Sequence, residues 1–288
     1  MRERRIELPA FLIERQQVLV AALDRIAPRC EQPPCEVHRS IRYTLLGPSK
    51  RVRGVLTLLT ADLFDGGEDP IAAAAAVELV HASSLILDDL PSMDDTGTRR
   101  GRPANHVEFG EATSILAAVA LLTLAFGHVA SSYPPLLAVA LARLLSETVG
   151  SNGLIGGQAA DLELPSQPLR VAEIEPVDER KTAVLFRAAA AAGAMVGGAA
   201  DQHVQGLADF GDRIGLAFQI VDDIIDTTGN PADVAADRRG HAAWIADLAE
   251  ARQRAEELAD GAVRLLAPFG PRAERLREFA RLVVDRVE

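Results

Sequence analysis

The chain has 288 residues, of which 48% are hydrophobic and 25% are charged, and its 30 basic and 41 acidic side chains give a formal net charge of −11. This acidity excludes a general nucleic-acid binder, and the composition excludes disordered and fibrous proteins. A chain of this length can bury about 75% of its unfolded surface and so form a large core.

Apolar residues, mostly Ala and Leu, recur at helical spacing from about residue 9 to the end of the chain. The clearest segments are 71–88, 113–130, 136–150, 183–200, 207–226 and 246–266. No segment has a convincing strand pattern. Clusters of Gly, Pro and Ser at 66–70, 91, 131–135, 164–176, 229–231 and 268–271 predict loops. Because no linker or internal repeat divides the chain, we predict one all-α domain over 1–288, a helical bundle with a central apolar cavity.

Two features bear on where the protein works. The longest apolar stretches, such as 115–127, are shorter than the roughly 18 residues that a membrane span needs, so we predict no membrane span. Cys30 and Cys35 are the only cysteines, too few for a disulfide framework or a four-ligand zinc site, and the N-terminus lacks the pattern of a signal or transit peptide. We therefore predict a reduced, cytoplasmic protein.

A first acidic cluster ends the apolar segment 71–88 and contains Asp88, Asp89, Asp94 and Asp95. One Asp pair alone is most often a solvated helix end, but carboxylates at a helix C-terminus face the negative end of the helix dipole. Mg²⁺, which takes carboxylate, water and phosphate oxygens, would compensate this charge. On a straight helix Asp88 and Asp94 would point about 120° apart. Pro91 opens the backbone between them, so that a bulged turn could bring both toward one ion.

A second acidic cluster, Asp222, Asp223 and Asp226, lies far downstream in the apolar segment 207–226. Asp222 and Asp226 are four residues apart, which places them about 40° apart on one helix face. No basic residue lies within one turn of the cluster, and this argues against a structural network of ion pairs. The sequence therefore indicates a second group of magnesium ligands.

The basic residues that accompany these clusters are few and grouped. Each group alone is typical of a solvated face. Together with two acidic clusters and the apolar helices between them, they indicate a substrate that is a diphosphate ester with an apolar tail. The groups are Lys50-Arg51-Val52-Arg53, Arg99-Arg100, and Lys181 with Thr182.

Residues 40–230 resemble the trans-type isoprenyl diphosphate synthases. Segment 88–94 is similar to the longer form of that family's first aspartate-rich motif, 222–226 to its second, and 50–53 to its Gly-Lys-Arg-x-Arg segment. Segments 78–101 and 115–122 are most similar to geranylgeranyl diphosphate synthases of bacterial carotenoid pathways. The resemblance implies a helical bundle of the isoprenoid synthase type, a homodimer, and three magnesium ions in each active site.

The resemblance also implies roles for individual residues. The catalytic set would be Asp88, Asp89, Asp94, Arg99, Lys181, Asp222, Asp223 and Asp226, of which Asp88, Asp94 and Asp222 would bind magnesium. The diphosphate of isopentenyl diphosphate would be held by Lys50, Arg53, His81 and Arg100. The allylic diphosphate would contact Arg99, Lys181, Thr182 and Gln219.

The sequence departs from the family pattern at two positions of note. Val119 stands where much of the family has Asp, although the carotenoid-pathway subgroup shares this apolar stretch. The family usually has a lysine a few residues after the second motif, where this chain has Asn230. Arg238 or Arg239 could supply the missing phosphate contact.

The implied reaction is ionisation of an allylic diphosphate, attack by the isopentenyl double bond and loss of a proton. Ser83 and Ser84 lie about one turn before Asp88, where small side chains would let the tail grow past fifteen carbons. Since one turn, about 5.4 Å, is close to one prenyl unit, we predict a geranylgeranyl (C20) product. Alternatively, the serines only pack helices closely and the product is farnesyl or longer than C20.

Two other classes of protein remain as alternatives. A non-catalytic regulatory subunit is favoured by the missing lysine at Asn230 and opposed by the intact aspartate motifs. A terpene cyclase would also ionise a prenyl diphosphate with magnesium. It would have no use for Lys50, Arg53 and His81, which the resemblance assigns to a second substrate.

Overall fold

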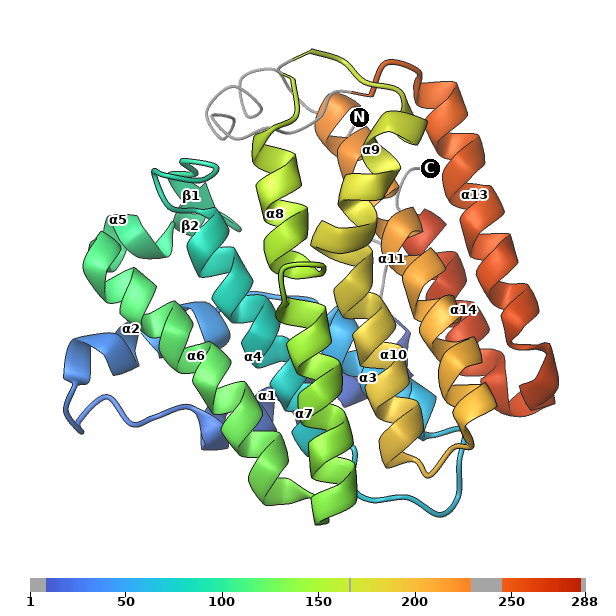
Figure 1. The fold of residues 1–288 in the computed structure, drawn as a ribbon, viewed down its shortest axis with the longest axis horizontal. Helices are drawn as coiled ribbons and strands as arrows, with labels where there is room; N and C mark the ends of the chain where they lie inside the picture. The colour runs from blue at the N-terminus through green and yellow to red at the C-terminus, as the bar shows by residue number, and fades with distance from the viewer. Residues whose placement is uncertain (1–8, 166, 229–244, 286–288) are drawn as a thin grey trace.

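A computed structural model describes residues 9–165, 167–228 and 245–285 as a bundle of helices (Figure 1). The first half of the chain contains α1 (Ala10–Ile26), α2 (Cys35–Leu45), α3 (Val52–Ala61), α4 (Ile71–Asp88), α5 (Asn105–Phe109), α6 (Glu111–Ser132) and α7 (Pro135–Val149). The second half contains α8 (Leu154–Leu162), α9 (Val171–Asp178), the π-helical turn η1 (Glu179–Ala183), α10 (Val184–Val196), α11 (Asp201–Thr228), α13 (Leu248–Leu265), the 3₁₀ helix η2 (Ala267–Ala273) and α14 (Glu274–Val284). The predicted all-α class is confirmed.

The core is built from helices rich in alanine, which can approach one another closely. Helix α4 lies in the middle of the bundle, and its residues 72–80 are all buried (Figure 1). Helix α10 packs on α3 at Gly193, where an added Cβ would lie 2.0 Å from the Thr60 hydroxyl and 2.1 Å from the carbonyl oxygen of Thr57. Only glycine fits this contact without a shift of backbone, so the close approach of the two helices depends on it.

A short hairpin is the one place where the described residues form paired strands. Strands β1 (Thr98–Arg99) and β2 (Arg102–Pro103) pair antiparallel. The central residues of the connecting turn, Arg100 and Gly101, have φ of 55° and 74°, the left-handed pair that suits a two-residue hairpin. The prediction that the chain has no strand is wrong here, because a pair of two-residue strands is too short to produce an alternating pattern.

Two loop predictions need correction. Residues 164–176 were expected to be a loop, but α9 begins at Val171 and includes Pro176. The carboxylate of Glu173 accepts the backbone N–H of Arg170 at 2.9 Å and so caps the start of this helix. The expected loop at 131–135 is also shorter, because α6 continues to Ser132 and α7 begins at Pro135, a first-turn position that proline tolerates.

Two helices are long and apolar enough to cross a membrane by length and composition alone. The expectation that every apolar stretch is too short is therefore wrong, whereas the absence of a membrane span stays a prediction. Interruptions by Gly, Ser, Thr and His made the apolar runs look shorter than the helices that contain them. In α4, 67% of the relevant window is buried inside the protein, as in a core helix. In α6 only 33% is buried, so this helix presents an exposed apolar face.

Candidate active site

The first acidic cluster is assembled where α4 ends. The helix stops at Asp88, and the next residues turn back so that the N–H of Asp94 donates to the carbonyl oxygen of Asp88 at 2.9 Å. Asp88 and Asp94 are therefore neighbours, as expected, but the helix ends before Pro91 rather than bulging around it. Burial raises the pKa of Asp88 to about 7. The charge of Lys181 opposes this shift, and the smaller effect of Asp94 adds to it. The crowded negative charge makes this a place where a cation would be stabilised.

Asp89 points to a different partner. It is buried, and both of its carboxylate oxygens accept from Nε of Arg99, at 3.0 and 3.3 Å, while Nη2 of Arg99 makes a further contact. Burial raises the pKa of Asp89, and the charge of Arg99 opposes this shift. Since a forked contact fixes both the position and the plane of a guanidinium, Asp89 serves here to hold Arg99.

Lys181 lies opposite this first cluster, in the π-helical turn η1. Its Nζ donates to Oδ2 of Asp161 at 2.6 Å and lies 3.7 Å from Oδ2 of Asp94. Gln158 also donates to Asp94, at 3.1 Å. Burial lowers the pKa of Lys181, but the opposing effects of Asp161 and Asp94 are larger together, so the pKa is raised above its ordinary value and the ammonium group remains charged. The turn thus places a fixed positive charge beside the carboxylate of Asp94.

The approach of α8 to this lysine depends on Gly157. A Cβ at this glycine would lie 2.3 Å from the backbone nitrogen of Lys181 and 2.5 Å from the carbonyl carbon of Arg180. These atoms belong to the backbone and cannot move aside cheaply. The glycine therefore permits α8 and η1 to touch, which brings Gln158 and Asp161 to the site.

A chain of hydrogen bonds connects η1 to the second acidic cluster on α11. The Thr182 hydroxyl donates to Oε1 of Gln219 at 2.8 Å, and Nε2 of Gln219 donates to Asp223 at 2.9 Å. Burial and the nearby charge of Asp178 raise the pKa of Asp223 well above its usual range. Burial and Asp161 likewise raise the pKa of Asp178 to about 7. Three carboxylates from three helices, those of Asp161, Asp178 and Asp223, thus share this part of the site.

The remaining members of the second cluster lie on the same helix as predicted. Asp222 is half-buried and Asp226 is exposed. Within the described ranges, no group of three carboxylate, imidazole or thiol side chains is already close enough to hold a metal ion. The donors present are carboxylate oxygens of Asp88, Asp94 and Asp222, which are the hard ligands that Mg²⁺ accepts. The donor set, with the crowded charge at Asp88, fits magnesium.

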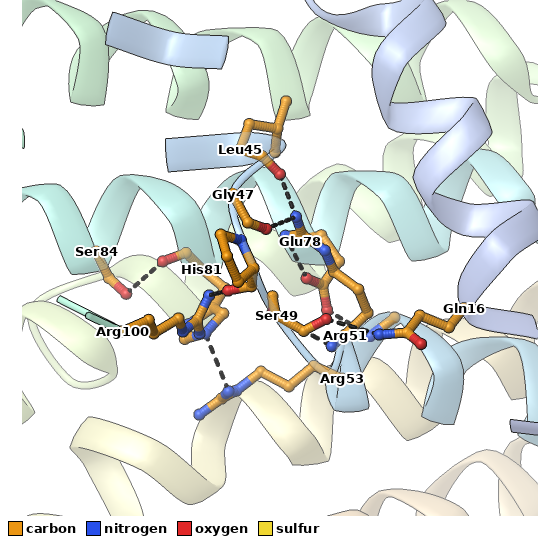
Figure 2. A network of polar contacts seen from close by, with 12 residues as sticks. Gln16, Leu45, Gly47, Ser49, Arg51, Arg53, Glu78, His81, Ser84 and Arg100 are labelled. Atoms are coloured by element: carbon orange, nitrogen blue, oxygen red, sulfur yellow. Dashed lines mark hydrogen bonds and ion pairs between the residues drawn. The ribbon is translucent and has the colours of Figure 1, made fainter. Parts of the chain in front are cut away.

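Three basic residues, Arg53, His81 and Arg100, lie together (Figure 2), and Arg53 is near Asp222. Nη1 of Arg53 contacts Nε2 of His81 at 3.2 Å, and its guanidinium carbon lies 4.6 Å from the ring centre of Phe186 and 5.9 Å from that of Phe218. Burial lowers the pKa of Arg53 to about 10, so it keeps its charge at neutral pH. The aromatic rings hold the buried guanidinium in place.

His81 is neutral in this environment, because burial and the charges of Arg53 and Arg100 lower its pKa well below 6.5. A guanidinium only donates, so Nε2 of His81 accepts and the ring proton resides on Nδ1. Arg100 donates to the carbonyl oxygen of Pro48 at 3.0 Å, and Lys50 is exposed in the neighbouring loop. The structure therefore brings the four residues predicted for isopentenyl diphosphate to one region.

The two serines before Asp88 differ in their surroundings. Ser83 is 3% exposed, and its hydroxyl donates to the carbonyl oxygen of Ala118 at 2.8 Å, which links α4 to α6. Ser84 is half-buried, and its hydroxyl donates to the carbonyl oxygen of His81 at 3.0 Å. Ser83 therefore packs helices closely, while the role of both serines in product length stays a prediction. Asn230, Arg238 and Arg239 lie outside the described residues.

The sequence analysis missed four residues that the structure places in or beside the site. Gln158 and Asp161 are polar positions in the short helix α8, and Asp178 is the last residue of α9. Glu78 is buried in the middle of α4. Glu78 is a single charged residue in an otherwise apolar part of α4, and that contrast was the available signal.

Comparisons with known proteins agree with this geometry. The polyprenyl synthetase family model matches residues 34–251. Geranylgeranyl pyrophosphate synthase 6 of Arabidopsis thaliana is 41% identical over 240 residues, covering 77% of this chain and 71% of the relative. An FPP/GFPP synthase from Zymomonas mobilis has a TM-score of 0.83 at 32% identity, covering 94% of this chain and 98% of the other. The geranyltransferase of Helicobacter pylori, solved with magnesium and isoprenyl diphosphate, has a TM-score of 0.81 at 26% identity, covering 98% of both chains.

The chain covers between 59% and 71% of the lengths of the Arabidopsis thaliana relatives that it matches. The predicted family is confirmed, whereas the specific likeness to carotenoid-pathway enzymes stays a prediction. Since the family model matches most of its length, the chain belongs to the polyprenyl synthetase family.

Proposed function

We propose that this protein is a trans-prenyltransferase that condenses isopentenyl diphosphate with an allylic prenyl diphosphate. The observation that supports this most directly is that each of the two aspartate clusters has basic side chains beside it. Lys181 and Arg99 lie beside Asp94 and Asp89. Arg53 is close enough to Asp222 that this carboxylate raises its pKa, against the larger effect of burial. Two cationic groups suit a reaction that needs two diphosphate substrates.

In this reaction the C1–O bond of the allylic substrate breaks, its electron pair leaves with the diphosphate, and the isopentenyl double bond attacks C1. A new C–C bond forms and leaves a positive charge on a carbon of the isopentenyl unit. One proton is then lost from the carbon next to this cationic carbon, which restores a double bond. Magnesium held by Asp88, Asp94 and Asp222 would neutralise charge on the leaving diphosphate. Arg99 and Lys181 add fixed positive charge there, each held by its own carboxylate partner.

The second diphosphate would be held by Arg53, Arg100, Lys50 and the Nδ1–H of His81. The lost proton has two candidate acceptors: the released diphosphate, and the Thr182 and Gln219 pair. The Thr182 hydroxyl donates its own proton to Gln219, so the lone pairs of its oxygen are the part that could accept another proton.

We propose geranylgeranyl diphosphate as the product, on the basis of the small side chains of Ser83 and Ser84. The relatives above include both geranylgeranyl and FPP/GFPP synthases, so other chain lengths are the principal alternative. The test is incubation of the purified protein with Mg²⁺, isopentenyl diphosphate and each allylic starter, with products read by mass spectrometry. A C20 end product is expected. A C15 or C25 end product would contradict the chain length but support the reaction.

A non-catalytic regulatory subunit is the second candidate, because the family lysine is replaced at Asn230. Folded protein that condenses no starter in the same assay would favour it over the synthase. A terpene cyclase is disfavoured, since the buried Arg53 and His81 pair would have no diphosphate to hold. A product that forms from a prenyl diphosphate without isopentenyl diphosphate would favour the cyclase.

We further propose that two copies of this chain associate through an apolar surface on α6, α7 and α8. This surface is defined by Ile115, Leu116, Val119, Leu136, Val139 and Ile155, whose exposed fractions run from 44% to 90%. Exposed apolar residues gathered on neighbouring helices commonly mark a protein interface. A second copy is the partner that fits best, because the predicted reaction needs no other protein. A cytoplasmic location likewise remains a proposal.

A further inference from the structure

We infer that Arg51 and Glu78 are positioning residues for the isopentenyl diphosphate site, a role that rests on the proposed function. Neither side chain can reach a ligand, since they are 3% and 1% exposed. They lie beside Arg53 and His81 and connect three separate parts of the chain (Figure 2). The inference is that this buried pair sets the geometry of the cationic group in front of it.

Arg51 joins the end of α2 to α4. Its Nη2 donates to the carbonyl oxygen of Gly47 at 3.1 Å and also to that of Leu45, the last residue of α2. Its Nη1 donates to Oε2 of Glu78 at 3.3 Å. One planar guanidinium thus satisfies carbonyl groups of Leu45 and Gly47 and a carboxylate of α4 from two separate nitrogens in a fixed plane, whereas a lysine would offer one nitrogen on a flexible stem.

Glu78 joins α4 to the start of α3. Its Oε1 accepts the backbone N–H of Gly54 at 2.9 Å, one of the first N–H groups of α3, which have no partner within the helix. A Cβ at Gly54 would lie 2.9 Å from Cγ of Glu78, 2.4 Å from a methyl carbon of Leu19 and 3.1 Å from the carbonyl oxygen of Ala74. The glycine therefore lets α3 approach α4 closely enough for this bond.

The two residues are spaced so that their contacts control the functional side chains. Arg51 immediately precedes α3, and Arg53 is the second residue of that helix. Glu78 and His81 are three residues apart on α4, which places them on one face. A pair that fixes α3 against α4 at residues 51 and 78 therefore fixes the 3.2 Å contact between Arg53 and His81.

The electrostatics point the same way. Arg51 lies near enough to Arg100 to lower the pKa of Arg100, and only burial has a larger effect on it. Glu78 raises the pKa of both Arg53 and Arg100 against burial. Glu78 is therefore a counter-charge that lets several cations remain close together before any diphosphate binds.

The backbone of Arg51 supports a functional rather than a purely stabilising role. Its φ of 53° is left-handed, a conformation that costs free energy at a residue with a side chain and that recurs at functional sites. Buried ion pairs are also poor sources of net stability, because removing both charges from water is costly. Orientation of the site is the benefit that offsets these costs.

The test compares steady-state kinetics of the full-length protein and its Arg51→Lys variant, which keeps the charge but loses the fork. We expect KM for isopentenyl diphosphate to rise about tenfold or more, as one or two charge-assisted hydrogen bonds are lost. KM for the allylic diphosphate should change less than about twofold. Glu78→Gln should shift the same constant in the same direction, because it leaves Arg51 without its counter-charge.

Two further variants separate positioning from stability. Leu276→Ala, a buried substitution in α14, should lower the melting temperature and leave both KM values unchanged. The double variant Arg51→Met with Glu78→Leu removes both buried charges together, so it should fold and still show the raised KM for isopentenyl diphosphate. Unchanged KM values in Arg51→Lys and in the folded double variant would overturn the inference. If the unmodified protein condenses no substrates, the proposed function itself fails.

Discussion

Lys181 and Asp161 form the shortest ion pair at the junction of α8 and η1, with 2.6 Å between Nζ and Oδ2. Asp161→Asn would keep an oxygen acceptor but remove the charge that holds Lys181 beside Asp94. We expect kcat to fall and KM for the allylic diphosphate to rise, about 10- to 100-fold in kcat/KM, as for a lost charge-assisted hydrogen bond. Steady-state kinetics provide the measurement. Glu163→Gln, an exposed position two residues further on, is the control and should behave like the unmodified protein.

The forked contact between Asp89 and Arg99 leads to a second prediction. Asp89→Asn should release Arg99 from its fixed plane and lower kcat about 100-fold, with the protein still folded. Arg99→Lys, which cannot form the fork, should have a similar effect. Kinetics together with circular dichroism check this. Glu108→Gln, on the exposed side of α5, is the control, and near-normal turnover in Asp89→Asn would refute the role assigned to the pair.

Asp178 predicts a pH-dependent stability. Burial raises its pKa from 3.8 to about 7, so the folded protein keeps a proton that the unfolded chain releases. The resulting stabilisation is complete below pH 3.8 and is lost as the pH rises through 7. Asp178→Asn, which is always neutral, should therefore gain about 3 kcal/mol more stability over the unmodified protein at pH 8 than at pH 5. Chemical denaturation at the two pH values measures this difference.

The control for this experiment is Asp65→Asn, at a carboxylate that is 80% exposed. Its effect on stability should be small and equal at the two pH values. An Asp178→Asn protein whose advantage does not grow with pH would show that the carboxyl group is not held protonated.

The apolar surface on α6 to α8 predicts a dimer that charges can break. Leu116→Glu together with Val119→Glu should convert a dimer into a monomer, since two carboxylates would be buried against apolar side chains. Sedimentation equilibrium gives the mass in solution. Val107→Glu, an equally exposed change on α5, should leave the dimer intact. An unmodified protein that is monomeric, or a charged variant that stays dimeric, would argue against this surface.

Ser83 gives a prediction about product length. Ser83→Phe should shift the end product from C20 toward C15, because the larger side chain would occupy space between α4 and α6; overpacking should also cost about 1 to 3 kcal/mol of stability. Ser83→Ala removes the hydrogen bond to Ala118 without adding volume and should leave the product unchanged. Ser84→Phe covers the half-buried neighbour. Mass spectrometry that finds the same product in both Phe variants would place the length control elsewhere.

The sequence predicted best those features that repeat along a helix or are dense in one kind of residue. Helix α4 was expected over 71–88 and spans Ile71–Asp88, so the first aspartate cluster begins at the predicted helix end, and the second cluster lies within α11. Helix α9 was missed because Pro176 and the polar residues around it are typical of a loop, whereas the structure accommodates this proline inside the helix without its backbone N–H donor.

The carboxylates that hold the cations were harder to predict. Asp161 lies twenty residues before Lys181 in the sequence and becomes its neighbour only through the packing of α8 on η1. The assignment of Asp89 to catalysis rested on its motif, while its actual contact with Arg99 depends on the hairpin that turns the chain back. Such long-range contacts leave no periodic pattern in the sequence.

The π-helical turn at 179–183 makes the length of the chain at this point as important as its composition. Its hydrogen bonds run over five residues rather than four, so it contains one residue more than an α-helical turn would need. Deleting one residue would restore regular winding but rotate α9 about 100° relative to α10. Asp178 would then leave the site while Lys181 stayed, or the reverse. Substitutions at the exposed Glu179 and Arg180 would be tolerated, whereas a change of one residue in the length of the turn would not.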